Sequence, residues 1–110
     1  MIKQINNSSV LSQKYLKCQD VMVIMGDPIR QTLIRCLLES KSDEGLRVGD
    51  LQCYTDLSRT TISHHLKVLR EAGVVAVDRK STKNYYYIDP QNTTLTGLID
   101  FWKEVETILK

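Results

Sequence analysis

Hydroxyl, imidazole and cationic side chains are concentrated in residues 57–75, Leu-Ser-Arg-Thr-Thr-Ile-Ser-His-His-Leu-Lys-Val-Leu-Arg-Glu-Ala-Gly-Val-Val. Ser58 is a favourable N-cap, and Gly73 falls where a helix end needs a residue that tolerates positive φ, so we expect one helix over residues 59–72. On a helical wheel, Leu66 and Leu69 lie within about 40° of Ile62 and form an apolar face. The other side carries Thr60, Ser63, His64, Lys67 and Arg70.

This polar side has the chemistry needed to read DNA. Small hydroxyls allow close approach to the major groove, and His, Lys or Arg side chains donate to base edges or phosphates. Arg59 and the free N–H groups of the helix N-terminus would also favour a phosphate. By itself the helix is equally compatible with an amphipathic surface helix whose polar side is only solvated, so the flanking elements must decide.

Composition limits the classes of protein to consider. At 110 residues the chain is long enough for one domain with a modest core. The net charge is +2, but residues 58–88 carry six Lys or Arg against two Asp or Glu, a local basic segment that favours nucleic-acid binding. The longest apolar run is only residues 21–25 and the N-terminus lacks a signal-peptide core, so we expect a cytoplasmic protein.

The elements around the polar-faced helix can be read from capping signals and periodicity. Residues 1–9 are polar and expected to be a flexible segment, and residues 10–25 have the apolar spacing of an amphipathic helix. After Gly26, Asp27 as N-cap and Pro28 at N1 predict a second helix to about Ser40. A short extended piece at 46–48, a short helix over residues 49–54 and a tight turn then lead into the polar-faced helix, which is the layout of a helix-turn-helix.

Two segments rich in strand formers, 74–77 and 85–88, flank a polar connection at 78–84. They predict a β-hairpin wing with Arg79, Lys80 and Lys83 in its basic loop. Such loops often serve solubility alone, but beside a polar-faced helix we favour contact with the DNA backbone. The loop has no glycine, which leaves its turn type open.

The last helix, which contains residues 95–109, has apolar side chains over about half of its wheel, more than one packing surface needs. We interpret it, together with the first helix, as a dimer interface, because one such module reads a single half-site and dimers read two. The alternative is a broad face buried within its own domain. The candidate interface residues are Leu11, Tyr15, Leu98, Trp102, Val105 and Leu109.

The assembled pattern resembles the arsenic-repressor (ArsR) family of bacterial winged-helix repressors over about residues 20–90. The matching motifs are Gly26-Asp27-Pro28-Ile29-Arg30, Val48-Gly49-Asp50-Leu51, the run 57–75 and Tyr85-Tyr86-Tyr87-Ile88. The resemblance implies a mainly α winged helix-turn-helix with about five helices and a two-stranded wing. It further implies a homodimer on an inverted-repeat operator, released by an inducer, with Arg59, Thr60, Ser63 and His64 as DNA contacts. His65 lies nearer the apolar face and is expected to pack.

Departures from the family concern what is sensed. The cysteine pair of members that sense arsenic, cadmium or lead is replaced by Arg47 and Gly49, and the last helix lacks the histidine of members that sense zinc, nickel or cobalt. We therefore expect no metal site and no cofactor, and the inducer is unidentified. Of the three cysteines, Cys18 lies in an apolar stripe and Cys36 at the edge of one, whereas Cys53 should be the most exposed.

Three other functions compete with that of a DNA-binding repressor. Cys53 could make the protein a thiol-based redox regulator, although an inert structural cysteine is favoured. A winged-helix module that binds another protein is a second alternative. An enzyme is not expected, because the sequence has no Ser-His-Asp arrangement, phosphate loop or metal-ligand spacing. In the favoured interpretation Thr60, Ser63 and His64 touch base edges, while Arg59, Lys67, Arg79, Lys80 and Lys83 engage phosphate or the minor groove.

Overall fold

The computed structural model describes residues 10–109, which form five helices and one antiparallel hairpin. The expected flexible segment 1–9 lies outside the described residues. The order is α1 (Val10–Met25), α2 (Pro28–Glu39), α3 (Val48–Tyr54), α4 (Arg59–Glu71), β1 (Ala76–Lys80), β2 (Lys83–Tyr87) and α5 (Thr93–Leu109). This is the winged helix-turn-helix that the sequence predicts.

Local capping determines where the central helices begin. The carboxylate of Asp27 accepts hydrogen bonds from the backbone N–H groups of Ile29 (2.9 Å) and Arg30 (3.1 Å), so α2 starts at Pro28 as expected. The Asp50 carboxylate accepts from the N–H of Arg47 at 2.9 Å, and α3 begins at Val48, one residue earlier than predicted. Gly73, with a φ of 79°, ends α4 as its position indicated.

The fully buried core joins α2, α3 and α4 to the chain that enters the hairpin. Its largest side chains are Leu33, Leu51, Ile62, Leu66, Leu69 and Val74. Leu46 exchanges two backbone hydrogen bonds with Tyr86, at 2.9 and 2.7 Å, and so adds a short bridge to the outside of β2. The expected extended piece at 46–48 is thus extended at Leu46, while Val48 already belongs to α3.

The wing corrects one sequence-based expectation. The predicted polar loop at 78–84 is almost entirely strand, because Asp78 pairs with Tyr85, Arg79 with Asn84 and Lys80 with Lys83. Only Ser81 and Thr82 remain as the turn, and the φ of 60° at Ser81 fits a type II′ turn, whose first central residue has positive φ. Pairing across the hairpin therefore makes strand of residues whose polarity had indicated a loop.

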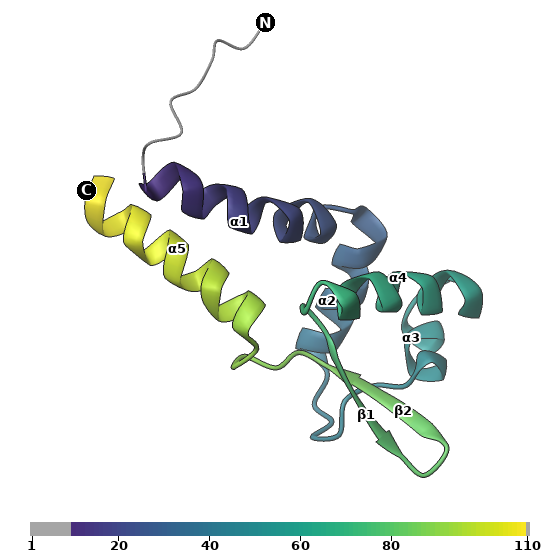
Figure 1. Ribbon diagram of the computed structural model, residues 1–110. Coiled ribbons are helices and arrows are strands. Elements are labelled where there is room, and N and C mark those ends of the chain that lie inside the picture. The colour runs from purple at the N-terminus through teal and green to yellow at the C-terminus, as the bar shows by residue number, and fades with distance from the viewer. Residues whose placement is uncertain (1–9, 110) are drawn as a thin grey trace, which may run out of the picture.

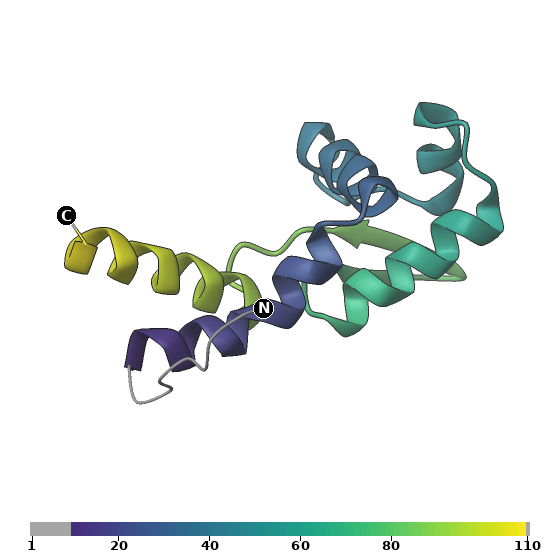
Figure 2. The same ribbon diagram turned by 90° about the horizontal axis from the view of Figure 1, so that it is seen from above.

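The two terminal helices lie side by side and project away from the remainder of the fold, as both views show (Figures 1 and 2). The ammonium of Lys14 in α1 contacts the carboxylate of Glu104 in α5 at 2.7 Å, and the rings of Tyr15 and Phe101 lie 5.8 Å apart. The molecule is elongated as a result, with extents of 49 × 31 × 23 Å. None of the helices described between residues 10 and 109 is long and apolar enough to span a membrane.

Candidate nucleic-acid interface

The turn between α3 and α4 is built from side-chain hydrogen bonds within a few residues. The hydroxyl of Thr55 donates to the Leu51 carbonyl at 2.7 Å and accepts from the N–H of Leu57 at 3.3 Å. The hydroxyl of Ser58 then accepts from the N–H of Thr61 at 3.1 Å, which caps α4 as the sequence predicts. These bonds fix the angle at which α4 leaves the turn.

The two faces of α4 differ as the wheel predicted. Ile62, Leu66 and Leu69 are all 0% exposed. The polar side chains on the opposite face are all exposed, namely Arg59, Thr60, Ser63, His64, Lys67 and Arg70. His65 is half-buried, and its ring lies 3.4 Å from Arg30 of α2, a position nearer the apolar face than that of His64.

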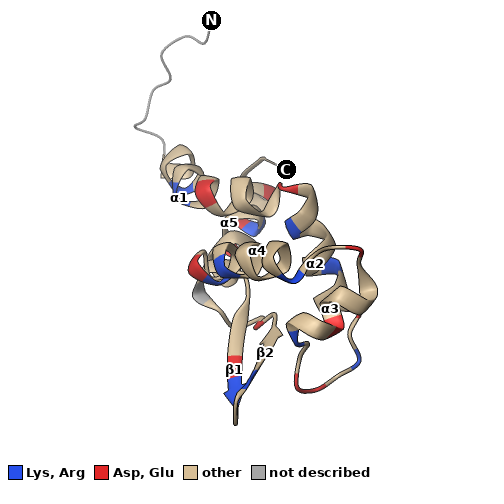
Figure 3. Ribbon diagram, turned by 90° about the vertical axis from the view of Figure 1, so that its right-hand side faces the viewer, with Lys and Arg blue, Asp and Glu red and all other residues tan. Residues whose placement is uncertain are grey.

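Basic side chains continue from α4 onto the wing, where Figure 3 shows blue segments on α4 and at the hairpin tip. Arg79, Lys80 and Lys83 are exposed. Lys80 and Lys83 stand directly opposite each other in the ladder, an arrangement of like charges that is unfavourable without an anion nearby. A phosphate at the wing tip would relieve that repulsion.

Sequence reasoning missed a partner of the wing. The carboxylate of Glu44, in the loop before α3, contacts the ammonium of Lys80 at 3.4 Å, and the same ammonium lies 5.7 Å from the centre of the Tyr85 ring. Both charged groups of the ion pair are about half exposed, so the pair contributes little to stability. Glu44 is 36 residues from Lys80, and no local pattern marks the contact.

The structure places the three cysteines in different surroundings. Cys53 is exposed, as expected, whereas Cys18 and Cys36 are half-buried. Burial, with a further contribution from the Glu39 charge, raises the pKa of the Cys36 thiol and makes it less reactive at neutral pH. Among residues 10–109, no group of three His, Cys, Asp or Glu is placed to hold a metal ion.

The expected dimer residues divide into two groups. Tyr15, Trp102 and Leu109 are 41%, 47% and 73% exposed, while Leu11, Leu98 and Val105 are half-buried within the chain. Further large apolar side chains on the same two helices are also open to solvent: Val10, Leu16, Val23, Ile99 and Ile108. Phe101 is buried within its own domain, and Leu95 and Leu98 are partly buried against the core of the same chain.

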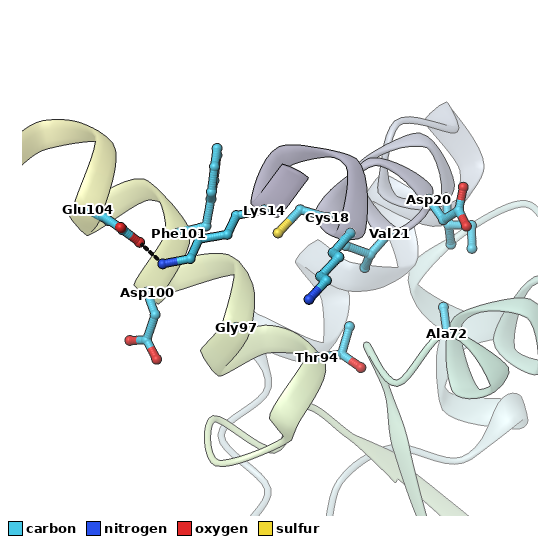
Figure 4. A pocket seen from close by; sticks show the side chains of 12 residues that line it. Lys14, Cys18, Asp20, Val21, Ala72, Thr94, Gly97, Asp100, Phe101 and Glu104 are labelled. Atoms are coloured by element: carbon cyan, nitrogen blue, oxygen red, sulfur yellow. Dashed lines mark hydrogen bonds and ion pairs between the residues drawn. The ribbon is translucent and has the colours of Figure 1, made fainter. Parts of the chain in front are cut away.

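A cavity of about 540 Å³ lies between α1 and α5 (Figure 4). Val21, Ile24 and Phe101 supply apolar lining, while Lys17 and Asp100 supply charges. The cavity also reaches Ala72, the C-cap residue that follows α4. One concave site therefore touches both the terminal helix pair and the end of the polar-faced helix.

Comparisons with known proteins agree with this geometry. Residues 27–77 match the model of the family described as bacterial regulatory protein, arsR family. The chain is 33% identical to an HTH-type transcriptional regulator of Methanocaldococcus jannaschii over 80% of this chain and 97% of that protein. It is 32% identical to the transcriptional repressor SdpR of Bacillus subtilis over 69% of this chain and 77% of that protein.

A solved structure supports the fold. The crystal structure of the transcriptional repressor BigR from Xylella fastidiosa superposes with a TM-score of 0.66 at 20% identity, covering 91% of this chain and 94% of that one. The resemblance seen in the sequence is confirmed, and the matched family is one of regulators and not of enzymes. This chain belongs to the ArsR family of DNA-binding transcriptional regulators.

Proposed function

We propose that this regulator is a repressor that binds an inverted-repeat operator as a homodimer and is released by an inducer. The observation that carries the proposal is the chemistry of α4, whose apolar face is fully buried while the whole opposite face of hydroxyl, imidazole and cationic groups stands exposed. The transcriptional repressor SdpR, at 32% identity, supports repression as the direction of the response.

Base reading is assigned to the middle of the exposed face of α4. Thr60, Ser63 and His64 are short enough for close approach to the major groove and carry donors and acceptors for base edges. Phosphate or minor-groove contacts are assigned to the longer cations, namely Arg59, Lys67, Arg79, Lys80 and Lys83. The ion pair of Lys67 with Glu71 spans 4.0 Å between exposed groups, so it leaves the lysine available.

Dimerisation is assigned to α1 and α5. The core of the DNA-binding part is complete within one chain, yet these two helices leave Trp102 and Leu109 largely exposed. Exposed apolar surface of this extent marks an interaction site. A two-fold symmetric copy would bury the surface and present a second α4 to the other half of an inverted repeat.

The inducer is assigned to the cavity between α1 and α5. Its volume of about 540 Å³ is within the range of small-molecule sites, and its lining combines apolar side chains with five charged residues. Because the cavity touches Ala72 at the end of α4, a bound molecule would act on the reading helix while remaining off the DNA face.

The proposal is tested by selecting genomic DNA fragments with the purified protein at fixed salt, alongside a variant carrying Ser63→Ala and His64→Ala. We expect the native protein to enrich an inverted repeat and the variant to lose the preference while still binding DNA. About eight phosphate contacts predict a log–log dependence of affinity on salt with a slope near −7. Failure of the native protein to enrich any sequence, with little salt dependence, would favour the alternative of a protein-binding module.

A further inference from the structure

Arg30 in α2 contacts two other helices at once. Its Nε donates to the backbone carbonyl of Ile24 at 2.7 Å, and its Nη1 lies 3.4 Å from Nδ1 of His65. Ile24 belongs to the last turn of α1, where helix carbonyls lack partners within the helix and favour a cation. The guanidinium thus joins the end of α1 to the inner side of α4.

The base of the Arg30 side chain is itself held in place. Its backbone N–H donates to the Asp27 carboxylate. This hydrogen bond is the main reason that the pKa of the Asp27 carboxyl is below its ordinary value. The charge of Arg30 and the N–H of Ile29 also lower that pKa, whereas desolvation raises it. Asp27 therefore stays ionised at neutral pH and keeps the first turn of α2, including Arg30, in register.

The contact with Arg30 is compatible with one tautomer of the neutral His65 ring. A guanidinium only donates hydrogen bonds, so Nδ1 of His65 must accept and the neutral ring must carry its proton on Nε2. The preceding residue, His64, packs edge-on against this ring, with centroids 5.1 Å apart and an angle of 67° between the planes. Fixing His65 therefore restrains His64, which projects from the exposed face of α4.

We propose that Arg30 is a positioning residue for DNA reading, which orients His64 through His65 and ties α4 to the end of α1. The inference rests on the proposed function, since it makes His64 a reader of bases. It also gives the cavity a second route to α4, because the Ile24 side chain lines the cavity while the Ile24 carbonyl binds Arg30. A shift of α1 would then change the position of the exposed polar face of α4.

The test compares Arg30→Met, which removes the donors, with Arg35→Met as the matched control. Arg35 is on the same helix, but its side chain is highly exposed and pairs with Glu39 on the same helix. His65→Phe removes the acceptor and keeps a ring, whereas His65→Asn keeps an acceptor near the position of Nδ1 and removes the ring that packs against His64. We expect Arg30→Met and His65→Phe each to lower the preference for operator over random DNA about 3- to 10-fold, and the double variant to show no larger decrease than either.

The controls separate positioning from support of the fold. Arg35→Met should keep the preference within about 2-fold of the native protein, whereas His65→Asn, which loses the ring that packs against His64, should lower it. Since Arg30→Met also removes the hydrogen bond to Ile24, a lower unfolding midpoint alone does not support the proposal. The His65 variants keep that hydrogen bond and leave the test valid if Arg30→Met fails to fold. An unchanged operator preference in a folded Arg30→Met or His65→Phe variant would overturn the inference.

A second readout does not depend on the operator. The chain has only two histidines, so long-range proton–nitrogen spectra in weakly alkaline buffer resolve both rings, with His64→Gln as the assignment variant. We expect the Nε2–H tautomer at His65, and altered ring signals of both histidines in Arg30→Met but not in Arg35→Met. An Nδ1–H tautomer at His65 would refute the link even if the protein selects an operator. If His65 has the expected tautomer but the protein selects no operator, the link between Arg30 and His65 stands and the proposed function is refuted.

Discussion

Helices α4 and α5 are both amphipathic, yet they bury their apolar faces to very different extents. In α4 the side chains of Ile62, Leu66 and Leu69 are completely buried by the other helices of the same chain. In α5, only Phe101 is buried among the described side chains, and Trp102 and Leu109 remain 47% and 73% exposed. The apolar face of α4 is thus buried within one chain, whereas much of the apolar face of α5 stays open to solvent.

The difference in burial indicates that α4 is held rigidly within its chain, whereas the α1–α5 pair is held less completely. Packing against α2 and α3 fixes α4, so its polar face can be held ready for a ligand at little further entropic cost. The pair α1 and α5 is joined by the contact of the Tyr15 and Phe101 rings and by the Lys14–Glu104 ion pair, both near solvent-exposed apolar side chains. If the chain dimerises or binds an inducer as proposed, the second region is the one that we expect to reorganise.

The largest effect expected from this comparison is at the centre of α4. Leu66→Ala should lower the free energy of unfolding by about 2–5 kcal/mol, because the side chain is 0% exposed and its removal leaves a cavity. Urea denaturation measures the change. Leu38→Ala, at a position 66% exposed on α2, is the control and should stay within about 0.5 kcal/mol. If both variants lost the same free energy of unfolding, Leu66 would contribute no more to the core than the exposed Leu38.

Truncation on α5 should instead affect assembly. Trp102→Ala should weaken self-association about 30-fold, because a half-exposed tryptophan at the centre of an apolar face has the character of an interface hot spot. Sedimentation equilibrium over a concentration series measures the association constant. Tyr54→Ala removes an aromatic side chain that is 67% exposed on α3 and should leave association unchanged. A Trp102 variant that associates like the native protein would contradict the assigned interface.

Two glycines at the junction of the regions should respond in opposite directions. Gly73 has a φ of 79°, and a Cβ there would lie 2.5 Å from the hydroxyl oxygen of Thr94, so Gly73→Ala should lower the free energy of unfolding by about 1–2 kcal/mol. Gly97 lies inside α5 with no atom within 4 Å of an added Cβ. Because alanine favours the helix more than glycine does, Gly97→Ala should raise the free energy of unfolding by about 0.5–1 kcal/mol. Chemical denaturation of both variants distinguishes these signs.

The wing should contribute affinity without sequence preference. Lys83→Ala is expected to weaken binding to operator and random DNA alike and to reduce the salt slope by about 1 for each phosphate that the protein no longer neutralises. Lys80→Ala should have a smaller effect, because Glu44 already offsets part of that charge. Titrations of both DNAs over a range of salt concentrations measure this. Weaker binding confined to the operator would mean that the wing reads bases.

The smallest effect is expected at Glu44. Glu44→Gln removes the carboxylate that contacts Lys80 at 3.4 Å, so it should tighten binding to all DNA roughly 2-fold by freeing the ammonium for phosphate. Asp43→Asn, one residue away and without a described partner at the wing, is the control for the removal of a negative charge. Equal tightening by both variants would show a general charge effect rather than release of Lys80.

The sequence predicted the helices well because their signals are local. Asp27 and Ser58 cap the turns that follow them, and Gly73 takes the positive φ that ends α4, so these boundaries were found to within a residue. The wing was less predictable. Its polar arms between Asp78 and Asn84 become strand only through pairing, and pairing depends on neighbours across the hairpin more than on side-chain preference.

The sequence by itself determined the family, the element order and the two-sided chemistry of α4, since these follow from spacing of a few residues along one chain. Tertiary structure alone decided that Arg30 reaches His65 across 35 positions and that Glu44 reaches Lys80 across 36. It also decided that α5 is left with an open apolar face. Such contacts join side chains far apart in sequence, and no local periodicity specifies them, because only the packing of the helices brings the groups within hydrogen-bonding distance.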